Sequence, residues 1–308
     1  MWFLNGFSAP TRDGVGPSCV GLTAGPWPTL LDFLAGRFPN VARQTWRERL
    51  ARGDVLGQSG APVSLAQAEA TPYPALLRQS PRLYYYREVP HEPPIPFDEV
   101  VLYQDAHLLV IDKPHFLPVV PSGGYLNETV LVRLKRKLGL DDLVPIHRID
   151  RDTAGLVMFS CQPASRSAYC QLFSQRAVQK TYEAIAPWRA DLTLPLVRSS
   201  RIQPAGHFML QHEVVGPPNA VTHIDLLEVR STLARYQLKP VTGQRHQLRV
   251  HMLGLGLPIL NDGLYPVLTP EGPPDPARPL QLLAKSLSFT DPVSGRTQQF
   301  VSQRQLQF

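Results

Sequence analysis

The sequence is short of three features that would mark its class at once: cysteine, long apolar runs and an excess of acidic residues. Three cysteines occur among 308 residues, and their spacing matches neither a metal site nor a disulfide framework. We therefore expect reduced thiols, as in a cytoplasmic protein, and no bound metal. These cysteines are Cys19, Cys161 and Cys170.

The apolar runs are too short for a membrane protein. None reaches the roughly 18 apolar residues that a spanning helix needs, and the first residues lack the basic start and apolar stretch of a signal peptide. We expect a protein of the cytoplasm that does not enter membranes. A formal charge of +6 favours a polyanionic partner only weakly, because many basic proteins never bind nucleic acid.

Proline is plentiful, and its distribution divides the chain. Four prolines fall within residues 90–96, where they stiffen the backbone and remove hydrogen-bond donors, as in a linker. We predict an irregular arm rich in Gly, Pro and Ser over residues 1–26, a small domain over 27–89, the linker over 90–96 and a large domain over 97–308.

In the small domain, apolar spacing predicts helices near residues 29–38 and 43–51, followed by a hairpin over 53–63. This order resembles a degenerate S4-type RNA-binding module, and the alternative is a helical cap that only packs on the large domain. The three consecutive tyrosines at 84–86, with arginines on either side, either stack on RNA bases or form a closing strand.

The large domain shows many strand patterns and few helical ones. Two strands, 220–230 and 233–241, are separated by a turn too short for a parallel crossover, so the sheet must be largely antiparallel. We predict an α+β fold around a mixed, mainly antiparallel sheet. The other expected strands are 108–112, 155–160, 181–187, 282–289 and 297–301, and the expected helices are 127–138, capped by Asn127, 164–176 and 245–253.

The most informative segment is residues 147–159, with the sequence HRIDRDTAGLVMF. Asp150 lies between Arg148 and Arg151, and neighbouring positive charges hold a carboxylate ionised even when it is partly buried. The segment is therefore typical of a carboxylate nucleophile or base. The alternative is a charged turn that only precedes an apolar strand.

This segment closely resembles the signature of the RluA-type pseudouridine synthases. Three further blocks match that family in the same order: residues 108–121, beginning LLVIDKP, residues 180–182, KTY, and residues 242–252, TGQRHQLRVHM. The resemblance implies the pseudouridine-synthase fold and an isomerase that converts uridine to pseudouridine in ribosomal or transfer RNA. Because the reaction exchanges one C–N bond for a C–C bond without redox change, no cofactor is expected.

The resemblance also implies roles for individual residues. Asp150 is the expected catalytic carboxylate, Arg249 its ionic partner, and Tyr182 the ring that stacks on the target uracil. Whether Asp150 attacks the sugar, attacks the base or removes the 2′ proton stays open. Because the base must leave the helical stack, Arg148 is expected to fill the vacated place and Leu248 to close the pocket.

Further RNA contacts are expected from basic residues outside the catalytic set. These are Arg151, Arg245 and the cationic end of the helix over 127–138, with Arg133, Arg136 and Lys137. The alternative for that helix end is an ordinary solvated face that complements the helix dipole. No obligatory protein partner is expected, and we take a monomer as the default.

The chain departs from the family pattern in three places. Gln244 and Arg245 replace the usual Arg and Thr, Asn261 replaces a Gly, and Leu283 replaces a His. If residues 245–253 are helical, Arg245 and Arg249 share one face, so that positive charge has shifted along the loop.

Two rival functions remain. A hydrolase could bind a metal through His147, Asp150, His246 and His251, but the five-residue spacing of the last two histidines places them off one helix face. The second rival is an RNA-binding protein of this fold that has lost catalysis, against which the intact Asp150, Tyr182 and Arg249 set argues.

Overall fold

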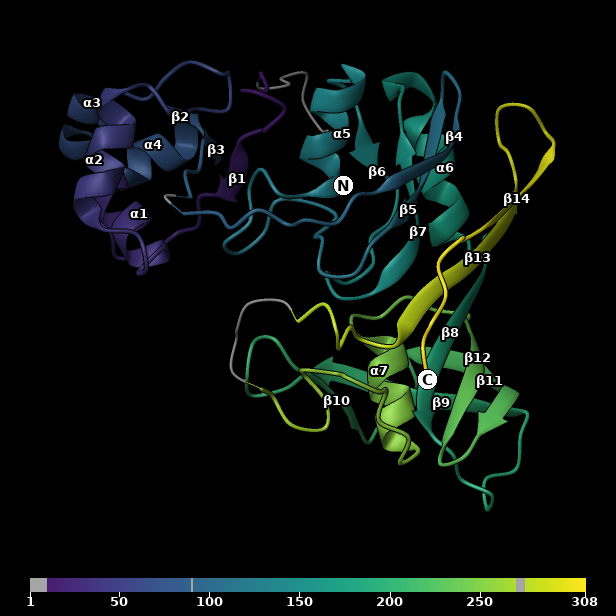
Figure 1. Cartoon of the computed structure of the whole chain (residues 1–308). Helices are drawn as coiled ribbons and strands as arrows, with labels where there is room; N and C mark the ends of the chain where they lie inside the picture. The colour runs from purple at the N-terminus through teal and green to yellow at the C-terminus, as the bar shows by residue number, and fades with distance from the viewer. Residues whose placement is uncertain (1–9, 90, 270–274) are drawn as a thin grey trace. The chain divides into compact units, whose positions relative to one another are not determined.

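The computed structural model describes residues 10–89, 91–269 and 275–308. It divides the chain into two compact units, Met1–Glu92 and Pro93–Phe308, and the division falls within the proline-rich segment. Figure 1 shows the elements of each unit. Within the described ranges, no helix is both long and apolar enough to cross a membrane.

The first unit packs four short helices beside a small antiparallel sheet. Helix α1 begins after Thr29, whose hydroxyl accepts from the amide of Asp32 while the Asp32 carboxylate accepts from the Thr29 amide, a reciprocal capping box. The helices are α1 (Leu30–Arg37), α2 (Arg43–Ala51), α3 (Leu65–Ala70) and α4 (Tyr73–Gln79). The last two were not predicted.

The sheet of this unit has the order β1-β3-β2, with β1 (Ser18–Gly21), β2 (Val55–Leu56) and β3 (Arg82–Tyr85). Strand β1 lies in the segment expected to be irregular, and Val20 from it joins the buried core. That expectation was therefore incomplete, because four residues of the arm pair with β3. Tyr85 is buried on β3, which favours the closing strand over base stacking for this ring.

The second unit is built on a mixed sheet of eleven strands. Its order is β10-β9-β11-β12-β8-β13-β7-β5-β4, with β14 beside β13 and β6 beside β7. The predicted α+β class with a mainly antiparallel mixed sheet is confirmed. The strands are β4 (Val100–Gln104), β5 (Leu108–Lys113), β6 (Val144–Pro145), β7 (Ala154–Ser160), β8 (Gln179–Pro187), β9 (Leu196–Pro204), β10 (Gln211–Val214), β11 (Ala220–Arg230), β12 (Leu233–Pro240), β13 (Leu282–Thr290) and β14 (Thr297–Val301).

Burial explains which strands could be predicted. All seven residues of β7 are buried, as expected for a central strand with an uninterrupted apolar sequence. The unpredicted strands β9 and β10 are mostly half-buried or exposed and carry polar residues, so their sequences lack an apolar pattern. Strand β4 is apolar in sequence but short and only half-buried, and it was also not predicted.

Three helices flank this sheet: α5 (Val130–Leu138), α6 (Pro163–Ser174) and α7 (Gln247–Gly254). The expected cap at Asn127 is wrong. Helix α5 begins after Thr129, whose hydroxyl accepts from the amide of Val132. The expected start of α7 at Arg245 is also wrong, because His246 adopts a left-handed conformation with φ 54° and the helix begins after it. Arg245 therefore lies outside the helix and shares no helical face with Arg249.

One strand joins the two chain segments that carry the expected catalytic residues. In β13, Ala284 pairs with Tyr182 of β8 on one side and with Gly155 of β7 on the other. The contact with β7 is parallel and covers two residue pairs. Gly155 has φ 108°, and a Cβ atom there would lie 2.3 Å from the Ala284 carbonyl oxygen. Only glycine permits this approach.

Replacing Gly155 with Ala should lower the free energy of unfolding by about 2–4 kcal/mol, because it combines an unfavourable φ with a backbone clash. Urea denaturation measures the change. Gly206→Ala is the matched control, since a Cβ atom at this position would meet nothing within 4 Å. Equal stability of the two variants would contradict this account of β7 and β13.

Candidate active site

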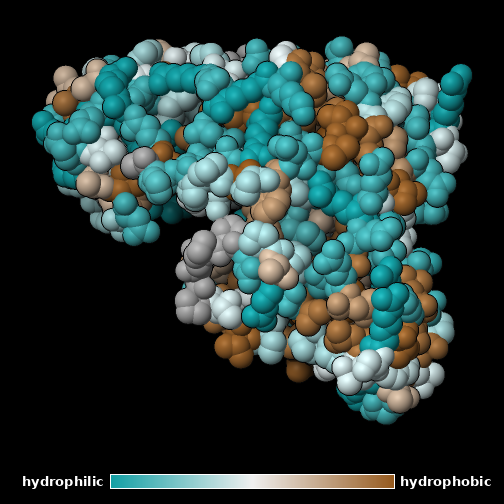
Figure 2. Space-filling model, in the orientation of Figure 1, coloured by the Kyte–Doolittle hydropathy of each residue, from teal (hydrophilic) through white to brown (hydrophobic). Residues whose placement is uncertain are grey.

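The second unit contains a cleft of about 1410 Å³, and the expected catalytic residues line it. Its walls come from the segment before β7, from β8, from the start of α7 and from the loop after α7. Asp150, Tyr182, Leu248 and Arg249 all contribute. Figure 2 shows hydrophobic patches on the lobe that carries β9 to β12, between hydrophilic stretches of surface.

The segment that carries Asp150 is held by a buried lysine. The ammonium group of Lys113 is fully buried and donates to the carbonyls of Pro114, at 2.8 Å, Leu117, at 2.9 Å, and Arg151, at 2.8 Å. All three of its donors are therefore used. Desolvation lowers the pKa of Lys113 to about 7, opposed by the nearby charges of Asp152 and Asp150. Lys113 therefore fixes the backbone next to Asp150.

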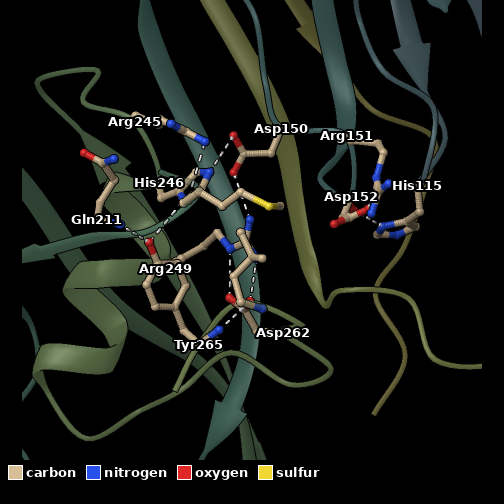
Figure 3. A network of polar contacts seen from close by, with 12 residues as sticks. His115, Asp150, Arg151, Asp152, Gln211, Arg245, His246, Arg249, Asp262 and Tyr265 are labelled. Carbon is tan, nitrogen blue, oxygen red and sulfur yellow. Dashed lines mark hydrogen bonds and ion pairs between the residues drawn. The ribbon is translucent and has the colours of Figure 1, made fainter. Parts of the chain in front are cut away.

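A second contact fixes the same segment two residues after Asp150. His115 Nδ1 lies 2.7 Å from the Asp152 carbonyl oxygen, and the Arg151 guanidinium bonds the Asp152 carboxylate at 2.9 Å (Figure 3). The amide of Thr153 also donates to the Asp150 carbonyl at 3.2 Å. The segment is thus a closed turn rather than a loose loop.

His147 anchors the beginning of this turn. Its Nε2 accepts from the amide of Met158 at 3.1 Å, and its ring stacks on Phe173 with centroids 4.5 Å apart. Burial, with a smaller contribution from the charge of Lys180, lowers the pKa of His147 to about 3. The ring is therefore neutral, as its acceptor role requires.

Asp150 meets the second expected catalytic residue across the cleft. Arg249 Nη1 donates to Asp150 Oδ2 at 3.2 Å, while Nε and Nη2 form a bidentate pair with Asp262 at 2.8 and 2.5 Å (Figure 3). The side chains of Arg249 and Asp262 are 2% and 1% exposed, whereas Asp150 is 31% exposed. Arg249 therefore holds a buried partner and presents its third nitrogen, Nη1, to a carboxylate that solvent can reach.

Asp262 was not predicted as a site residue. Its Oδ1 also accepts from the amides of Leu264 and Tyr265, at 2.8 and 3.1 Å. Burial would lower the pKa of Arg249, but the hydrogen bonds and charge of Asp262, with the charge of Asp150, prevail and raise it. Thirteen positions separate Asp262 from Arg249, so no short-range signal reveals the pair and only the fold does.

His246 brings a further ring to the carboxylate. Its Nε2 lies 3.9 Å from Asp150 Oδ1, beyond hydrogen-bond distance, and its Nδ1 lies 3.0 Å from the Tyr265 hydroxyl. Burial lowers the pKa of His246, so the ring is neutral at neutral pH. Its left-handed backbone directs the ring toward the cleft, and such strained residues gather at functional sites.

Tyr182 and Leu248 provide the apolar wall. Leu248 is 7% exposed, and Tyr182 packs on the apolar cluster beneath α7. Burial, followed by the charge of Asp150, raises the pKa of Tyr182, so that its hydroxyl stays protonated. The phenol next to Asp150 is thus a neutral ring face rather than a phenolate.

The expected RNA-binding residues fall into two groups. Arg148, Arg151 and Arg245 line the cleft. Arg133, Arg136 and Lys137 do not line it, although Arg136 and Lys137 are exposed on α5.

Arg133 has partners within its own unit. Its guanidinium donates to the carbonyls of Phe97 at 2.7 Å and Ile95 at 2.5 Å, and it pairs with Glu128. An RNA contact for the α5 group stays a prediction, and for Arg133 the structure offers a packing role instead.

Arg245, which stands where the family pattern has a different residue, makes hydrogen bonds of its own. Arg245 donates to the carbonyls of Phe208 at 2.9 Å and Met209 at 3.4 Å, and Gln244 donates to the Asn219 carbonyl at 3.4 Å. Arg245 therefore joins the start of α7 to the β9–β10 connection.

The histidines of the rival metal site lie apart. His147 stacks on Phe173, whereas His251 lies 3.1 Å from the Ser200 hydroxyl and 2.9 Å from that of Thr222. In the described part of the chain, no group of three or more His, Cys, Asp or Glu side chains is arranged to hold a metal ion.

Comparison with known proteins agrees with this geometry. The family described as RNA pseudouridylate synthase matches residues 107–253. The dual-specificity RNA pseudouridine synthase RluA of Haemophilus influenzae is 32% identical over 225 residues, which cover 69% of this chain and 96% of that protein. RluA of Escherichia coli K12 is 35% identical over 210 residues, covering 65% and 91%.

Among solved structures, human RNA pseudouridylate synthase domain containing 4 superposes with a TM-score of 0.52 at 26% identity, covering 68% of this chain and 88% of the human one. The chain belongs to the RNA pseudouridine synthase family and is similar to its RluA-type members. It is an isomerase that acts on RNA.

Replacing Arg249 with Met should lower the free energy of unfolding by about 3–5 kcal/mol, because Asp262 is then a buried carboxylate without its cation. The double variant Arg249→Met/Asp262→Asn should regain part of this loss. The asparagine side chain is uncharged, and its oxygen still accepts from the backbone amides of Leu264 and Tyr265. Urea denaturation of four proteins, the wild type, Arg249→Met, Asp262→Asn and the double variant, measures the coupling. A loss of stability in the double variant equal to the sum of the two single losses would exclude a coupling between the residues.

The pKa of His147 predicts a loss of stability in acid. Its folded value, about 3, lies below the usual value of 6.5, so the unfolded chain takes up the proton first as the pH falls. The stability that the neutral His147 contributes to the folded state is fully present above pH 6.5. It is lost as the pH falls toward 3, at up to about 1.4 kcal/mol per pH unit. Urea denaturation from about pH 7 to about pH 4 should show a shallower slope for His147→Gln. The exposed His223→Gln, measured over the same pH range, is the control for the loss of a histidine.

Proposed function

We propose that this enzyme isomerises specific uridines of ribosomal or transfer RNA and that Asp150 is its catalytic carboxylate. The observation that carries the proposal is the position of Asp150, solvent-accessible in the cleft and hydrogen-bonded to a buried arginine that a second carboxylate holds in place. The name of the bacterial relatives, dual-specificity RNA pseudouridine synthase, supports substrates of more than one kind.

The reaction breaks the bond between C1′ and N1 of uridine, turns the detached uracil and joins C1′ to C5. The proton lost from C5 is balanced by one gained at N1, so no other reactant is consumed. Asp150 acts on the sugar or the base, and Arg249 donates a charge-assisted hydrogen bond that orients the carboxylate.

Flipping brings the uracil from the stack into the cleft at a cost of a few kcal/mol. The ring of Tyr182 then stacks on it, and Leu248 closes the pocket. Because the raised pKa of Tyr182 keeps its phenol protonated, the residue is not itself the base. Its hydroxyl assists the final proton transfer as a relay, which takes the C5 proton while it gives its own to a neighbouring acceptor. Arg148, exposed at the cleft, takes the place that the uracil leaves.

The small unit over residues 27–89, with its S4-type resemblance, is the proposed second RNA contact, and the linker over 90–96 connects it to the catalytic domain over 97–308. We propose that the enzyme works in the cytoplasm as a monomer. Its basic net charge suits the RNA backbone.

Replacing Asp150 with Ala should abolish pseudouridine formation while folding and RNA binding persist, because Arg249 keeps Asp262 as a partner. Carbodiimide mapping of ribosomal and transfer RNA from cells that lack the protein, carry the wild type or carry Asp150→Ala measures this. A uridine modified only with the wild type identifies the substrate. Restoration by Asp150→Ala would exclude Asp150 as the catalytic group.

Tyr182→Phe should keep RNA affinity and lose turnover by about 10²-fold or more if the hydroxyl takes part in proton transfer. Tyr182→Ala should also weaken binding, because it removes the stacking face. Single-turnover rates and filter binding on the mapped RNA separate the two effects. Wild-type rates for Tyr182→Phe would leave stacking as the sole role of the ring.

A further inference from the structure

The connection between β9 and β10 presents an aromatic ring to solvent. Phe208 is 76% exposed and is the one aromatic residue among the exposed large apolar side chains of the described residues. An exposed ring contributes little to folding, since its apolar surface stays in water. The neighbouring Met209 lines the cleft, so Phe208 lies at its rim.

The tip that carries this ring is ordered by its own backbone. The amide of Ala205 donates to the Leu210 carbonyl at 3.0 Å, and the amide of Leu210 donates to the His207 carbonyl at 2.9 Å. Arg245 then bonds the carbonyls of Phe208 and Met209. The His207 ring lies tilted beside that of Phe208, with centroids 4.8 Å apart. These contacts hold the tip and still leave most of the Phe208 ring in solvent.

The same tip is connected to the catalytic centre by a second route. The Tyr265 hydroxyl accepts from the amide of Gln211, at the end of the tip, at 2.8 Å and contacts His246, whose ring lies 3.9 Å from Asp150 (Figure 3). Arg245 is the residue immediately before His246. Tyr265 and His246 therefore form a chain of contacts from the tip to the neighbourhood of Asp150.

We propose that Phe208 stacks on an unpaired base of the RNA beside the target uridine and that Arg245 positions the tip for this contact. The inference rests on the proposed RNA substrate and adds a residue that binds it beside the target uridine. Aromatic rings stack on exposed bases with little regard to base identity, and they suit single-stranded segments. This proposal gives a role to the Gln244-Arg245 departure from the family pattern. Arg245 holds the tip through the carbonyls of Phe208 and Met209 rather than binding an RNA phosphate.

The test uses an RNA stem-loop that carries the mapped uridine. Phe208→Ala should raise KM roughly tenfold with kcat little changed, as expected for the loss of one base stack. Phe208→Trp should restore the wild-type KM, whereas Phe208→Leu, apolar but without a π face, should resemble the alanine variant. Wild-type behaviour of Phe208→Ala or of Phe208→Leu would overturn the stacking contact.

A spectroscopic readout tests the contact directly. Two stem-loops carry 2-aminopurine on one side or the other of the target uridine, and binding is followed with Asp150→Ala protein so that no turnover occurs. Stacking should quench the fluorescence of one probe, and the additional change Phe208→Leu should abolish the quenching. Quenching that is absent from both probes, or that persists with Leu, would overturn the proposal.

Val215→Ala is the matched control, because Val215 is fully exposed beyond the other end of β10 and does not line the cleft. It should leave KM and quenching unchanged, and a KM as high as that of Phe208→Ala would count against a specific role for Phe208. Turnover of the wild type on the same stem-loop tests the proposed function separately. Thermal unfolding of Phe208→Ala should match the wild type, since the ring is exposed.

Discussion

The arrangement of the cleft depends on one guanidinium that two carboxylates share. Arg249 is almost completely buried, and the cost of removing its charge from water is offset by the bidentate bond to Asp262 and by the contact with Asp150. Because the buried pair is complete without Asp150, the more exposed carboxylate can approach substrate without leaving an unpaired cation. The buried ion pair uses Nε and Nη2 of Arg249, and the contact with the exposed carboxylate uses Nη1.

The polar interior around this pair is organised before RNA arrives. Lys113 binds three carbonyls, His115 contacts a fourth, and His147 accepts a hydrogen bond from a backbone amide, all within the segments that hold the turn around Asp150. The entropy of ordering this turn is therefore lost during folding rather than during binding. The lowered pKa values of His147 and His246 fit this scheme, because a neutral imidazole can be buried at a smaller desolvation cost than an imidazolium.

The sequence predicted the parts of the fold in which local pattern and burial agree. Strand β7 is apolar and wholly buried, so it could be found, whereas β9 and β10 are largely solvated and could not. The expected cleft residues were found through four ordered motifs, but Asp262 was not. Its pairing with Arg249 depends on the path by which the loop after α7 folds back against that helix.

The predicted first residues of α5 and α7 were wrong because the backbone conformation at each helix start cannot be read from the sequence. Thr129 rather than Asn127 caps α5, and the left-handed backbone of His246 delays α7 beyond Arg245. The role of Arg245 followed from this shift, because an arginine just before the helix reaches the β9–β10 tip. Finally, Ala284 pairs with Gly155 on one side and Tyr182 on the other, so main-chain bonds set the gap between the turn that carries Asp150 and the ring of Tyr182. The width of the cleft at this point is therefore a fixed number of strand spacings, which no rearrangement of side chains alone can change.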